Sequence, residues 1–318
     1  EVSTGALTFA RMGGIFASNQ TGAGTVSLTF ASLALGTDAT ANFQGVNLGT
    51  ATNRILFTTA PTLVGGAVAA TNGILARATV NGSTFATYNT NGTAVNTNGI
   101  QAFTGYNFTS ATNINSAAAT DTVDANAAMT TKNLTATKTV NALRLSGAVG
   151  QTVGGAAFNQ LVLTSGGILA TGAATHTLSV PVLNNAAVQN IFHVDSGSTL
   201  NVTSILVGTA GLVKDGAGTL ILSPTNLGGV SHNTLSGIVT VARGTLQLAG
   251  GTNTMTPNQF LVMGGPSATL DLNGTSQQIL GLLTDTANPG SGGVITSSTG
   301  TGQLVINADN TARTWAGS

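Results

Sequence analysis

Several residue types are scarce in this chain of 318 residues, and each scarcity excludes a class of structure or of binding partner. Cysteine is absent, which excludes a disulfide framework and thiolate metal sites. Lysine and arginine together number 9, as do aspartate and glutamate, so the net charge is zero and no basic cluster marks a nucleic-acid-binding surface. The most apolar run, Leu63–Ala70, is far shorter than the roughly 18 to 20 residues of a helical membrane span. We therefore expect neither a nucleic-acid partner nor a membrane span in this chain.

Strong helix formers are also scarce, whereas residues that favour strands and turns are abundant. Glutamate occurs only at Glu1, while glycine occurs 43 times and threonine, valine and asparagine are frequent. Hydrophobic residues make up 42% of the chain, which is enough for a buried core. We predict an all-β chain with almost no helix. Asn-Gly pairs, which favour tight turns between strands, occur at Asn72-Gly73, Asn81-Gly82, Asn91-Gly92, Asn98-Gly99 and Asn273-Gly274.

A short strand motif recurs along the second half of the chain. Gly211–Ser223 reads GLVKDGAGTLILS and Gly244–Gly250 reads GTLQLAG, each with a Gly-Thr-Leu-x-Leu strand. Shorter versions occur at Thr177–Val180, Ser198–Val202, Ala268–Leu272 and Gly302–Ile306. The first leucines of the units are residues 178, 200, 220, 246, 270 and 304, so the spacings are 22, 20, 26, 24 and 34 residues. A unit that returns at this interval indicates a solenoid with loops of variable length.

Within each unit the apolar residues alternate with polar ones. This period of two is typical of strands and excludes solenoids built from helices. We therefore predict a parallel β-helix, a β-solenoid with an irregular inserted segment, in which Gln247 and Asp271 face solvent or another subunit. The residues expected to form the inward ladder are Leu178, Leu200, Leu220, Leu222, Leu246, Leu248, Leu270, Leu272 and Leu304.

Gly211–Gly250 resembles the autotransporter-associated β-strand repeat, also called the passenger-associated transport repeat. The opening matches that family's GLxKxGxGTLxLS, including Lys214, and the close matches GTLxL, whereas the loop between them lacks the family's aromatic NTYTGGT. The resemblance implies a right-handed parallel β-helix in a large secreted or surface protein of bacteria, and the motif carries no catalytic residue. Its turn glycines are Gly211, Gly216, Gly218 and Gly244.

Pattern regularity divides the chain into three parts. Residues 1–75 contain strands of the solenoid type, and residues 141–318 form the regular solenoid with the motif at 211–250. Residues 76–140 are less regular and are expected to be an inserted or packing subdomain on the same solenoid. Within them, Ser110–Thr131 is a candidate loop with a short helix around Ala117–Met129.

The titratable residues give little sign of catalysis. Asp121 and Asp124 are the only close pair of acids, and they suit either a solvated turn or a weak calcium site. His176, His193 and His232 lack the spacing of zinc ligands, although coil stacking could bring His176 to His193. We expect no enzyme activity, no metal and no cofactor, and rank a β-helical polysaccharide-acting enzyme last.

Aromatic residues offer two further candidates for contacts. The cluster Tyr88, Phe103, Tyr106 and Phe108 either contacts glycans or packs the core of the irregular part. Trp315 lies close to the end of the sequence and is expected either to cap the solenoid or to contact a neighbouring subunit.

The ends of the sequence point to self-association. A solenoid normally carries polar caps, and none is evident here, since Ser3–Phe9 already has a strand pattern. The chain reads as a processed or excised piece of something longer. We expect a non-enzymatic structural protein of the cell surface or extracellular space, which joins head to tail into a fibre, stalk or layer; the alternative is an adhesive passenger that binds glycans or other cell-surface proteins. The candidate subunit contacts are Val2, Leu7, Phe9, Arg313 and Trp315.

Overall fold

The computed structural model describes residues 1–66, 73–90, 98–106, 113–185, 188–225, 233–284, 292–307 and 315–317. Within these ranges the protein is almost entirely β, with 31 strands and one 3₁₀ turn, η1 (Ile114–Ser116). Strands of successive turns pair in parallel, so the fold is a β-solenoid of about 11 turns. The predicted all-β solenoid is confirmed, whereas the helix expected around Ala117–Met129 is wrong, because β10 (Thr122–Ala125) lies there.

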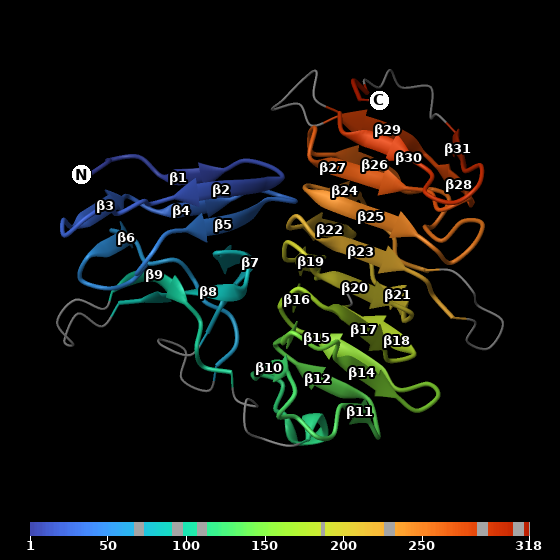
Figure 1. Ribbon diagram of the computed structural model, residues 1–318, viewed down its shortest axis with the longest axis horizontal. Helices are drawn as coiled ribbons and strands as arrows, with labels where there is room; N and C mark the ends of the chain where they lie inside the picture. The colour runs from blue at the N-terminus through green and yellow to red at the C-terminus, as the bar shows by residue number, and fades with distance from the viewer. Residues whose placement is uncertain are drawn as a thin grey trace.

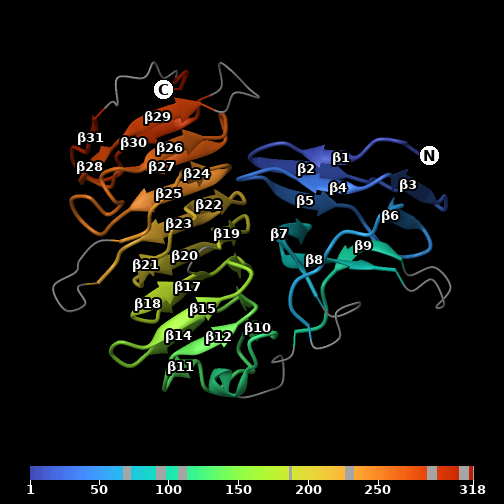
Figure 2. The same cartoon turned by 180° about the vertical axis from the view of Figure 1, so that it is seen from behind.

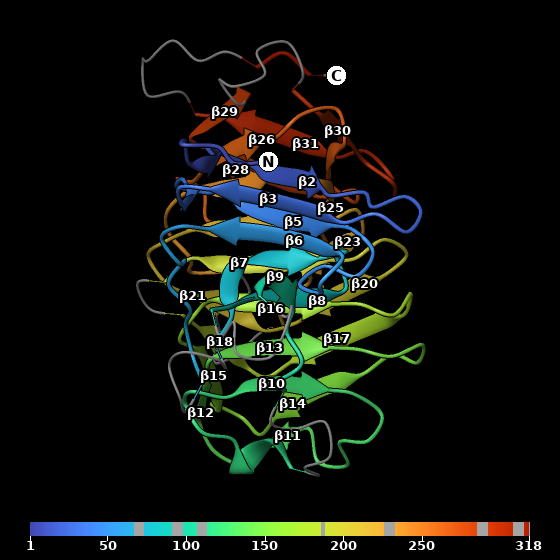
Figure 3. The ribbon, with the colours of Figure 1, turned by 90° about the vertical axis from the view of Figure 1, so that its left-hand side faces the viewer.

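The turns form two stacks that lie side by side and run in opposite directions (Figures 1 and 2). The N-terminal stack comprises the described residues up to 106, and the C-terminal stack begins at residue 113. In Figure 1 the N-terminal stack descends from β1, whereas the C-terminal stack rises from β11 to β29. The first and last turns of the chain therefore lie toward the same end of the molecule, as the side view also shows (Figure 3).

The C-terminal stack has three faces. The first sheet has the order β10, β13 (Ala142–Leu145), β16 (Gly167–Ala170), β19 (Asn190–Val194), β22 (Leu212–Asp215), β24 (Val239–Val241), β26 (Phe260–Met263) and β29 (Gly281–Thr284). The second has the order β11 (Asn133–Leu134), β14 (Thr152–Gly155), β17 (Thr175–Ser179), β20 (Thr199–Val202), β23 (Thr219–Leu222), β25 (Gly244–Leu248), β27 (Ala268–Asp271) and β30 (Val294–Thr296). The third face comprises β12 (Lys138–Val140), β15 (Gln160–Leu163), β18 (Val182–Asn184) and β21 (Ile205–Val207), and further along β28 (Ser276–Ile279) with β31 (Gln303–Ile306).

The first two sheets differ in how their residues alternate. Strands of the second sheet, such as β23 and β25, alternate between buried and half-buried residues, because one face covers the core and the other faces outward. Strands of the first sheet, such as β16, β19 and β22, are buried at every position. Both faces of the first sheet are therefore covered, one by the solenoid core and the other by the N-terminal stack.

The predicted leucine ladder forms most of the inward rows of the second sheet. Register places one leucine of each GTLxL unit directly against the next, so the side chains stack between turns. All but one of the nine predicted leucines are buried. The row that best matches the prediction consists of Leu200, Leu220, Leu246 and Leu270, and Leu222 and Leu248 stand together in the neighbouring row; Leu272 follows β27 in the core.

Two of the predicted leucines stand elsewhere. The residue opposite Leu200 is His176, and Leu178 belongs to the neighbouring row. Leu304 lies on β31 in a different sheet and is only partly buried, while Ile295 continues the main row at the last turn. Counting the first leucine of each unit misplaced both, because a histidine or an isoleucine can fill the inward position.

The outward residues of the GTLxL strands are partly covered. Asp271 accepts hydrogen bonds from Gln247 Nε2 at 2.7 Å and from the backbone nitrogen of Ser298 at 2.8 Å. The side chain of Asp271 is buried within the chain, and the expectation that it faces solvent or another subunit is wrong. Burial would raise its pKa, but these hydrogen bonds hold the pKa below its ordinary value.

The N-terminal stack has three turns and a core rich in aromatic rings. Phe9, Phe43, Phe57 and Tyr88 are buried in it, in edge-on or tilted contacts along the stack. Its sheets are β2 (Gly13–Ala17), β5 (Thr40–Gln44), β7 (Leu75–Val80), β8 (Thr84–Asn89) and β9 (Gly99–Ala102); β1 (Leu7–Phe9) with β4 (Leu33–Leu35); and β3 (Val26–Phe30) with β6 (Asn53–Phe57).

The boundaries between the two stacks differ from the boundaries predicted from the regularity of the sequence pattern. β7, placed by sequence at the start of the insertion, pairs in parallel with β5 and belongs to the N-terminal stack. β10, β11 and β12 already form the first turn of the C-terminal stack. Among the described strands, β8 pairs in the antiparallel sense with both β7 and β9, and it follows a turn in which Asn81 and Gly82 both take a left-handed φ, as Asn-Gly pairs do.

Candidate functional site

Two regions stand out as candidate functional sites: the seam where the two stacks meet, and the end of the molecule where both the first and the last turn lie. The seam is partly apolar. Phe85, Phe103 and Tyr106 of the N-terminal stack pack with Ala142 and Leu169 on the outer face of the first sheet. Further toward the last turns, Met12 packs with Val213, Ala242 and Val262. The apolar outer face of the first sheet thus holds the two stacks together.

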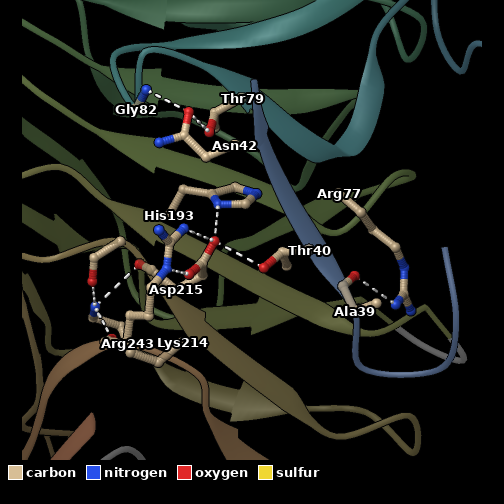
Figure 4. Close-up of polar contacts among 11 residues, drawn as sticks. Ala39, Thr40, Asn42, Arg77, Thr79, Gly82, His193, Lys214, Asp215 and Arg243 are labelled. Atoms are coloured by element: carbon tan, nitrogen blue, oxygen red, sulfur yellow. Dashed lines mark hydrogen bonds and ion pairs between the residues drawn. The ribbon is translucent and has the colours of Figure 1, made fainter. Parts of the chain in front are cut away.

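A buried ion pair lies in the same seam (Figure 4). Arg243 donates two hydrogen bonds to Asp215, from Nε to Oδ1 at 2.7 Å and from Nη2 to Oδ2 at 3.0 Å. Thr40, from the N-terminal stack, donates its hydroxyl to the same Oδ2 at 2.8 Å. The Nδ1 atom of His193 lies 3.4 Å from that oxygen. The carboxylate of Asp215 on β22 therefore contacts β19 of its own stack and β5 of the N-terminal stack.

The electrostatics of Asp215 follow from these partners. Burial would raise its pKa, but the contacts with His193 and Arg243 hold the pKa well below its ordinary value. Gly13 lies directly against this ion pair, and a Cβ atom there would come within 2.3 Å of Asp215 Oδ1 and 2.7 Å of Arg243 Nε. A glycine at this position lets the backbone of β2 approach the pair closely.

Lys214, the lysine of the repeat motif, points into the core beside this cluster. It is fully buried, and its Nζ donates to the backbone oxygens of Asp215, Gly216 and Arg243 at 3.0, 2.7 and 3.0 Å. In register its neighbours along the first sheet are apolar, Phe192 and Val241. Burial lowers the pKa of Lys214 to about 7, although the nearby Asp215 opposes the shift. The motif lysine thus donates hydrogen bonds to backbone carbonyls of two successive turns inside the solenoid.

The motif glycines lie in the turns of the same region. Gly211, Gly216 and Gly244 have φ values of 81°, 83° and 68°, in the left-handed region that favours glycine. Gly218 lies so close to the preceding turn that a Cβ atom would come within 2.3 Å of the backbone oxygen of Asp195. All four glycines therefore serve the tight turns between stacked strands.

Two further polar contacts join the stacks. The side chain of Gln189, from the C-terminal stack, accepts a hydrogen bond from Arg77 Nη2 at 2.7 Å and donates one to Asp38. Toward the first turns of the C-terminal stack, Arg144 lies over the ring of Tyr106 at 3.7 Å and forms a 2.6 Å ion pair with Asp124. Polar contacts therefore hold the seam at several levels.

A cleft of about 290 Å³ opens beside the ion pair, between the two stacks. Asn42, Gln44 and Asn81 line it from the N-terminal stack, and Asp195 and Ser196 line it from the C-terminal stack. In the described part of the chain, no side-chain hydrogen bond involves Gln44 or the hydroxyl of Ser196. The cleft therefore presents polar groups that are free to meet a ligand.

One end of the molecule is covered, and we call it the closed end. In the N-terminal stack the antiparallel pair β8–β9 ends the parallel pairing. In the C-terminal stack η1 and its flanks cover the first turn, where Ile114 and Met129 are fully buried. Asn115 adds side-chain hydrogen bonds to the backbone of residues 133 and 135. These features act as caps for both stacks.

The opposite end, which we call the open end, consists of the first turn, residues 1–30, and the last turn, β29–β31. Burial falls toward it: β5 is almost wholly buried, whereas every residue of β3 is only half-buried, and β31 has no buried residue. A hollow of about 240 Å³ opens beside the first turn, lined mainly by Phe16, Leu28 and Phe30. The large apolar side chains exposed here are Val2 (77%), Ile15 (54%), Val305 (43%) and Ile306 (47%).

The residues predicted as subunit contacts have different environments at this end. Val2 is exposed and Leu7 is half-buried, whereas Phe9 is buried in the core. Trp315 packs on the last turn of the C-terminal stack, and its indole nitrogen donates to the oxygen of Gly292 at 3.1 Å. Trp315 therefore covers part of the core, and Arg313 lies outside the described residues.

The predicted glycan-contact aromatics are core residues. Tyr88 is buried, and its hydroxyl bonds to the backbone nitrogen and oxygen of Phe57. Phe103 and Tyr106 pack edge to face within the seam, and Tyr106 bonds to Thr84. Their rings cannot stack on a sugar without unfolding the seam, so core packing is the better explanation. Phe108 lies outside the described residues.

The acids and histidines singled out by sequence are buried and bonded. Asp121 and Asp124 are buried, so neither a solvated turn nor an open calcium loop describes them. His176 Nδ1 accepts a hydrogen bond from the backbone nitrogen of Gln151, so its Nε2 donates to the oxygen of Thr171. Burial lowers the pKa of His176. It lies on β17 of the second sheet and His193 on β19 of the first, so the stack does not bring them together. His232 lies outside the described residues.

Within the described ranges, no group of three or more histidine or acidic residues could hold a metal ion. No helix found in those ranges has the length and hydropathy of a membrane span. Comparisons with protein-family models, with curated proteins and with solved structures returned no match. The function therefore has to be inferred from the residues and their geometry.

Sequence reasoning missed the seam. Thr40 and Asp215 are 175 residues apart, and nothing local links them. A signal was nevertheless present: the first-sheet strands GILA (β16) and FLVM (β26) are apolar at every position, unlike the alternating GTLQL. Continuous apolar strands in a parallel sheet indicate that a second layer covers them.

Proposed function

We propose that this protein is a non-enzymatic structural protein that associates with further copies of itself through the open end. The observation that carries the proposal is the contrast between the two ends. Caps cover the closed end, whereas the open end leaves strand edges and large apolar side chains exposed. Open edges of parallel sheets are templates for pairing with another chain.

The proposed place of the protein at the cell surface rests on the repeat motif. The repeat at 211–250 resembles the autotransporter-associated β-strand repeat, and the structure gives its lysine and glycines a purely structural use in the turns. We take this as support for a place at the bacterial surface or outside the cell, in a fibre, stalk or layer. The buried and bonded acids support a role without catalysis.

Light scattering over a wide range of protein concentrations tests self-association. We expect the mass to exceed that of one chain at high concentration, and Ile15→Lys to return it to one chain, because a lysine on the exposed β2 edge opposes edge pairing. Val149→Lys, at a residue that is 72% exposed in the turn between β13 and β14, is the matched control and should leave the mass unchanged. An intact protein that stays monomeric throughout would overturn the proposal.

A second candidate function, adhesion to glycans, is favoured by the cleft at the seam. Amide, hydroxyl, carboxylate and guanidinium groups face one space, and such groups bond well to sugar hydroxyls. Titration of the protein with a panel of monosaccharides and short glycans, followed by nuclear magnetic resonance shifts, tests it. Ser196→Arg should fill the cleft and abolish the shifts; binding that survives this change, or no binding at all, would reject this role.

A further inference from the structure

The cleft between the two stacks contains one acid that has no cationic partner among the described residues. Asp195 lines the cleft from the C-terminal stack and is half-buried. Its Oδ1 accepts a hydrogen bond from the backbone nitrogen of Ser196 at 2.8 Å, and its Oδ2 accepts one from the hydroxyl of Thr171 at 3.0 Å. Both donors are neutral, and no ion pair in the described ranges includes Asp195. A carboxylate has about four acceptor positions, so Asp195 can still accept hydrogen bonds from a ligand.

The basic residues that line the cleft face a different acid. Arg243 donates two hydrogen bonds to Asp215, and Nδ1 of His193 faces the same carboxylate. The strand that precedes Arg243, β24, lies two strands away from β19, which precedes Asp195. Two strand spacings amount to about 10 Å. The cleft therefore has an unbalanced negative charge at Asp195 and an ion pair farther along the sheet, which favours a cationic group of a ligand at Asp195.

The neutral polar groups that line the cleft can bond to hydroxyl groups. Asn42 accepts hydrogen bonds through its Oδ1 from Thr79 Oγ1 at 3.3 Å and from the backbone nitrogen of Gly82 at 2.9 Å. Its amide nitrogen is turned away from both partners (Figure 4) and donates no hydrogen bond within the described part of the chain. The side chain of Gln44 and the hydroxyl of Ser196 form no side-chain hydrogen bond there either. These groups offer donors and acceptors to a ligand with several hydroxyls.

Gly82 and Ile15 shape the cleft for a compact ring. Gly82 has a φ of 71°, and a Cβ atom there would come within 2.8 Å of Asp195 Oδ1, so the glycine keeps this carboxylate uncrowded. Ile15 is 54% exposed and supplies an apolar wall, on which the C–H groups of a sugar ring can pack. The volume of about 290 Å³ lies at the small end of ligand pockets and suits a single sugar unit.

We propose, building on glycan adhesion as the second candidate function, that the cleft binds a sugar unit with a free amino group, such as glucosamine. The ammonium group donates charge-assisted hydrogen bonds to Asp195. The ring hydroxyls bond to Ser196 of the same stack and to Asn42 and Gln44 on β5 of the N-terminal stack. The bound sugar therefore contacts both stacks, and a negatively charged sugar is repelled by Asp195.

Titrations followed by nuclear magnetic resonance compare glucosamine, N-acetylglucosamine, glucose, glucuronate and N-α-acetyl-lysine amide. We expect glucosamine to bind roughly fivefold or more tighter than glucose, because a hydrogen bond to a charged group is stronger than one between neutral groups. N-acetylglucosamine should bind as weakly as glucose, since acetylation removes the charge, and glucuronate should bind least. The lysine derivative, which has the ammonium group without the ring, should bind more weakly than glucosamine. Amide signals from both β5 and the turn after β19 should shift.

A variant of the acid tests which residue makes this selection. Asp195→Asn should abolish the preference for glucosamine and leave the affinity for glucose unchanged, because the neutral amide still accepts a hydrogen bond but does not attract a cation. Asp271→Asn, at a buried acid of the second sheet, is the matched control and should keep the preference. Circular dichroism checks that each variant is folded. The ranking of the probes with the unchanged protein needs no variant, so it decides the inference even where Asp195→Asn fails to fold.

The outcomes separate this inference from the function it rests on. Equal binding of glucosamine and glucose, or a preference that survives in folded Asp195→Asn, would overturn the amino-sugar site and leave glycan adhesion in place. A lysine derivative that binds as tightly as glucosamine would also overturn it, because the cleft would then select the ammonium group alone. If no sugar shifts any signal, this inference and glycan adhesion both fail, whereas self-association stands on its own test.

Discussion

The N-terminal and C-terminal stacks fold in the same way but differ in length and in the side chains that fill them. The C-terminal stack has a first sheet of 8 strands and a core of leucine, valine and isoleucine, with Phe192 as its one fully buried aromatic residue in the described part. The N-terminal stack has three turns, and its core adds Phe9, Phe43, Phe57 and Tyr88 to aliphatic side chains. The longer stack therefore has an aliphatic core, and the shorter stack has aromatic rings in its core.

The difference has a simple physical cause. A turn in the middle of a solenoid is packed on both sides, whereas a turn at an end is packed on one, so a short stack consists mainly of end turns. Aromatic side chains bury about 150–250 Å² each, more than aliphatic ones, and can compensate for missing neighbours. The seam adds a second surface, through which the N-terminal stack rests on the first sheet of the longer one.

The largest expected effect comes from the aliphatic core. Replacing Leu246 with aspartate removes a fully buried side chain and introduces a charge without a partner. We expect a loss of more than about 4 kcal/mol and unfolding of the neighbouring turns, since truncation of a buried leucine alone costs about 2–5 kcal/mol. Thermal unfolding followed by circular dichroism measures it. Gln247→Ala, on the outward side of the same strand, is the control and should cost about 1 kcal/mol; equal losses would contradict the inward ladder.

A smaller and more local effect is expected at the seam. Asp215→Asn removes the buried carboxylate that pairs with the half-buried Arg243, and breaking a buried ion pair typically costs about 3–5 kcal/mol. Hydrogen exchange should quicken in β2 and β5, because the N-terminal stack loosens, while the interior of the second sheet keeps its protection. Asp271→Asn, whose carboxylate lies on the other sheet, serves as the control. Unchanged exchange in β2 and β5 would show that the ion pair does not hold the stacks together.

The smallest expected effect is the change in the free energy of unfolding per pH unit that is caused by Lys214. Its pKa falls from an ordinary value of 10.5 to about 7 in the folded protein, so between these values the unfolded chain holds one more proton than the folded chain. The free energy of unfolding should therefore rise from pH 7 to pH 10.5, by at most about 1.4 kcal/mol per pH unit.

Denaturant unfolding at several pH values measures this slope. Lys214→Met should remove the slope, whereas Lys138→Met, a part-buried lysine of the third sheet, should leave it in place. A slope that survives in Lys214→Met would assign the pH dependence to another group.

The sequence predicted those features of the fold that depend on residues close to one another in the chain. The GTLxL strands, the inward position of Leu220 and Leu246, and the turn glycines follow from period two and from backbone sterics, which act within a few residues. His176 shows where that logic ends: it takes a leucine position because two backbone groups bond its ring, and no pattern of apolar residues reveals this.

The opposite directions of the two stacks could not be predicted from local sequence patterns. Strands of both stacks have the same local pattern, and their packing depends on contacts such as Thr40 with Asp215, far apart in sequence. The burial of Lys214 and Asp215 was likewise hidden, because a charged residue beside a glycine turn usually faces solvent. The unbroken apolar strands β16 and β26 of the first sheet were the sequence feature that pointed to a covering layer.

Hydrogen exchange at two protein concentrations tests most directly whether copies meet at the open end. Backbone amides at an unpaired edge exchange quickly, and pairing with a second chain slows them. We predict that residues 1–30 and β29–β31 gain protection when the protein is concentrated, while η1 and β8–β9 at the closed end exchange at the same rate in dilute and concentrated samples. Protection that appears at the closed end, or no change at the open end under conditions where light scattering detects association, would contradict the account.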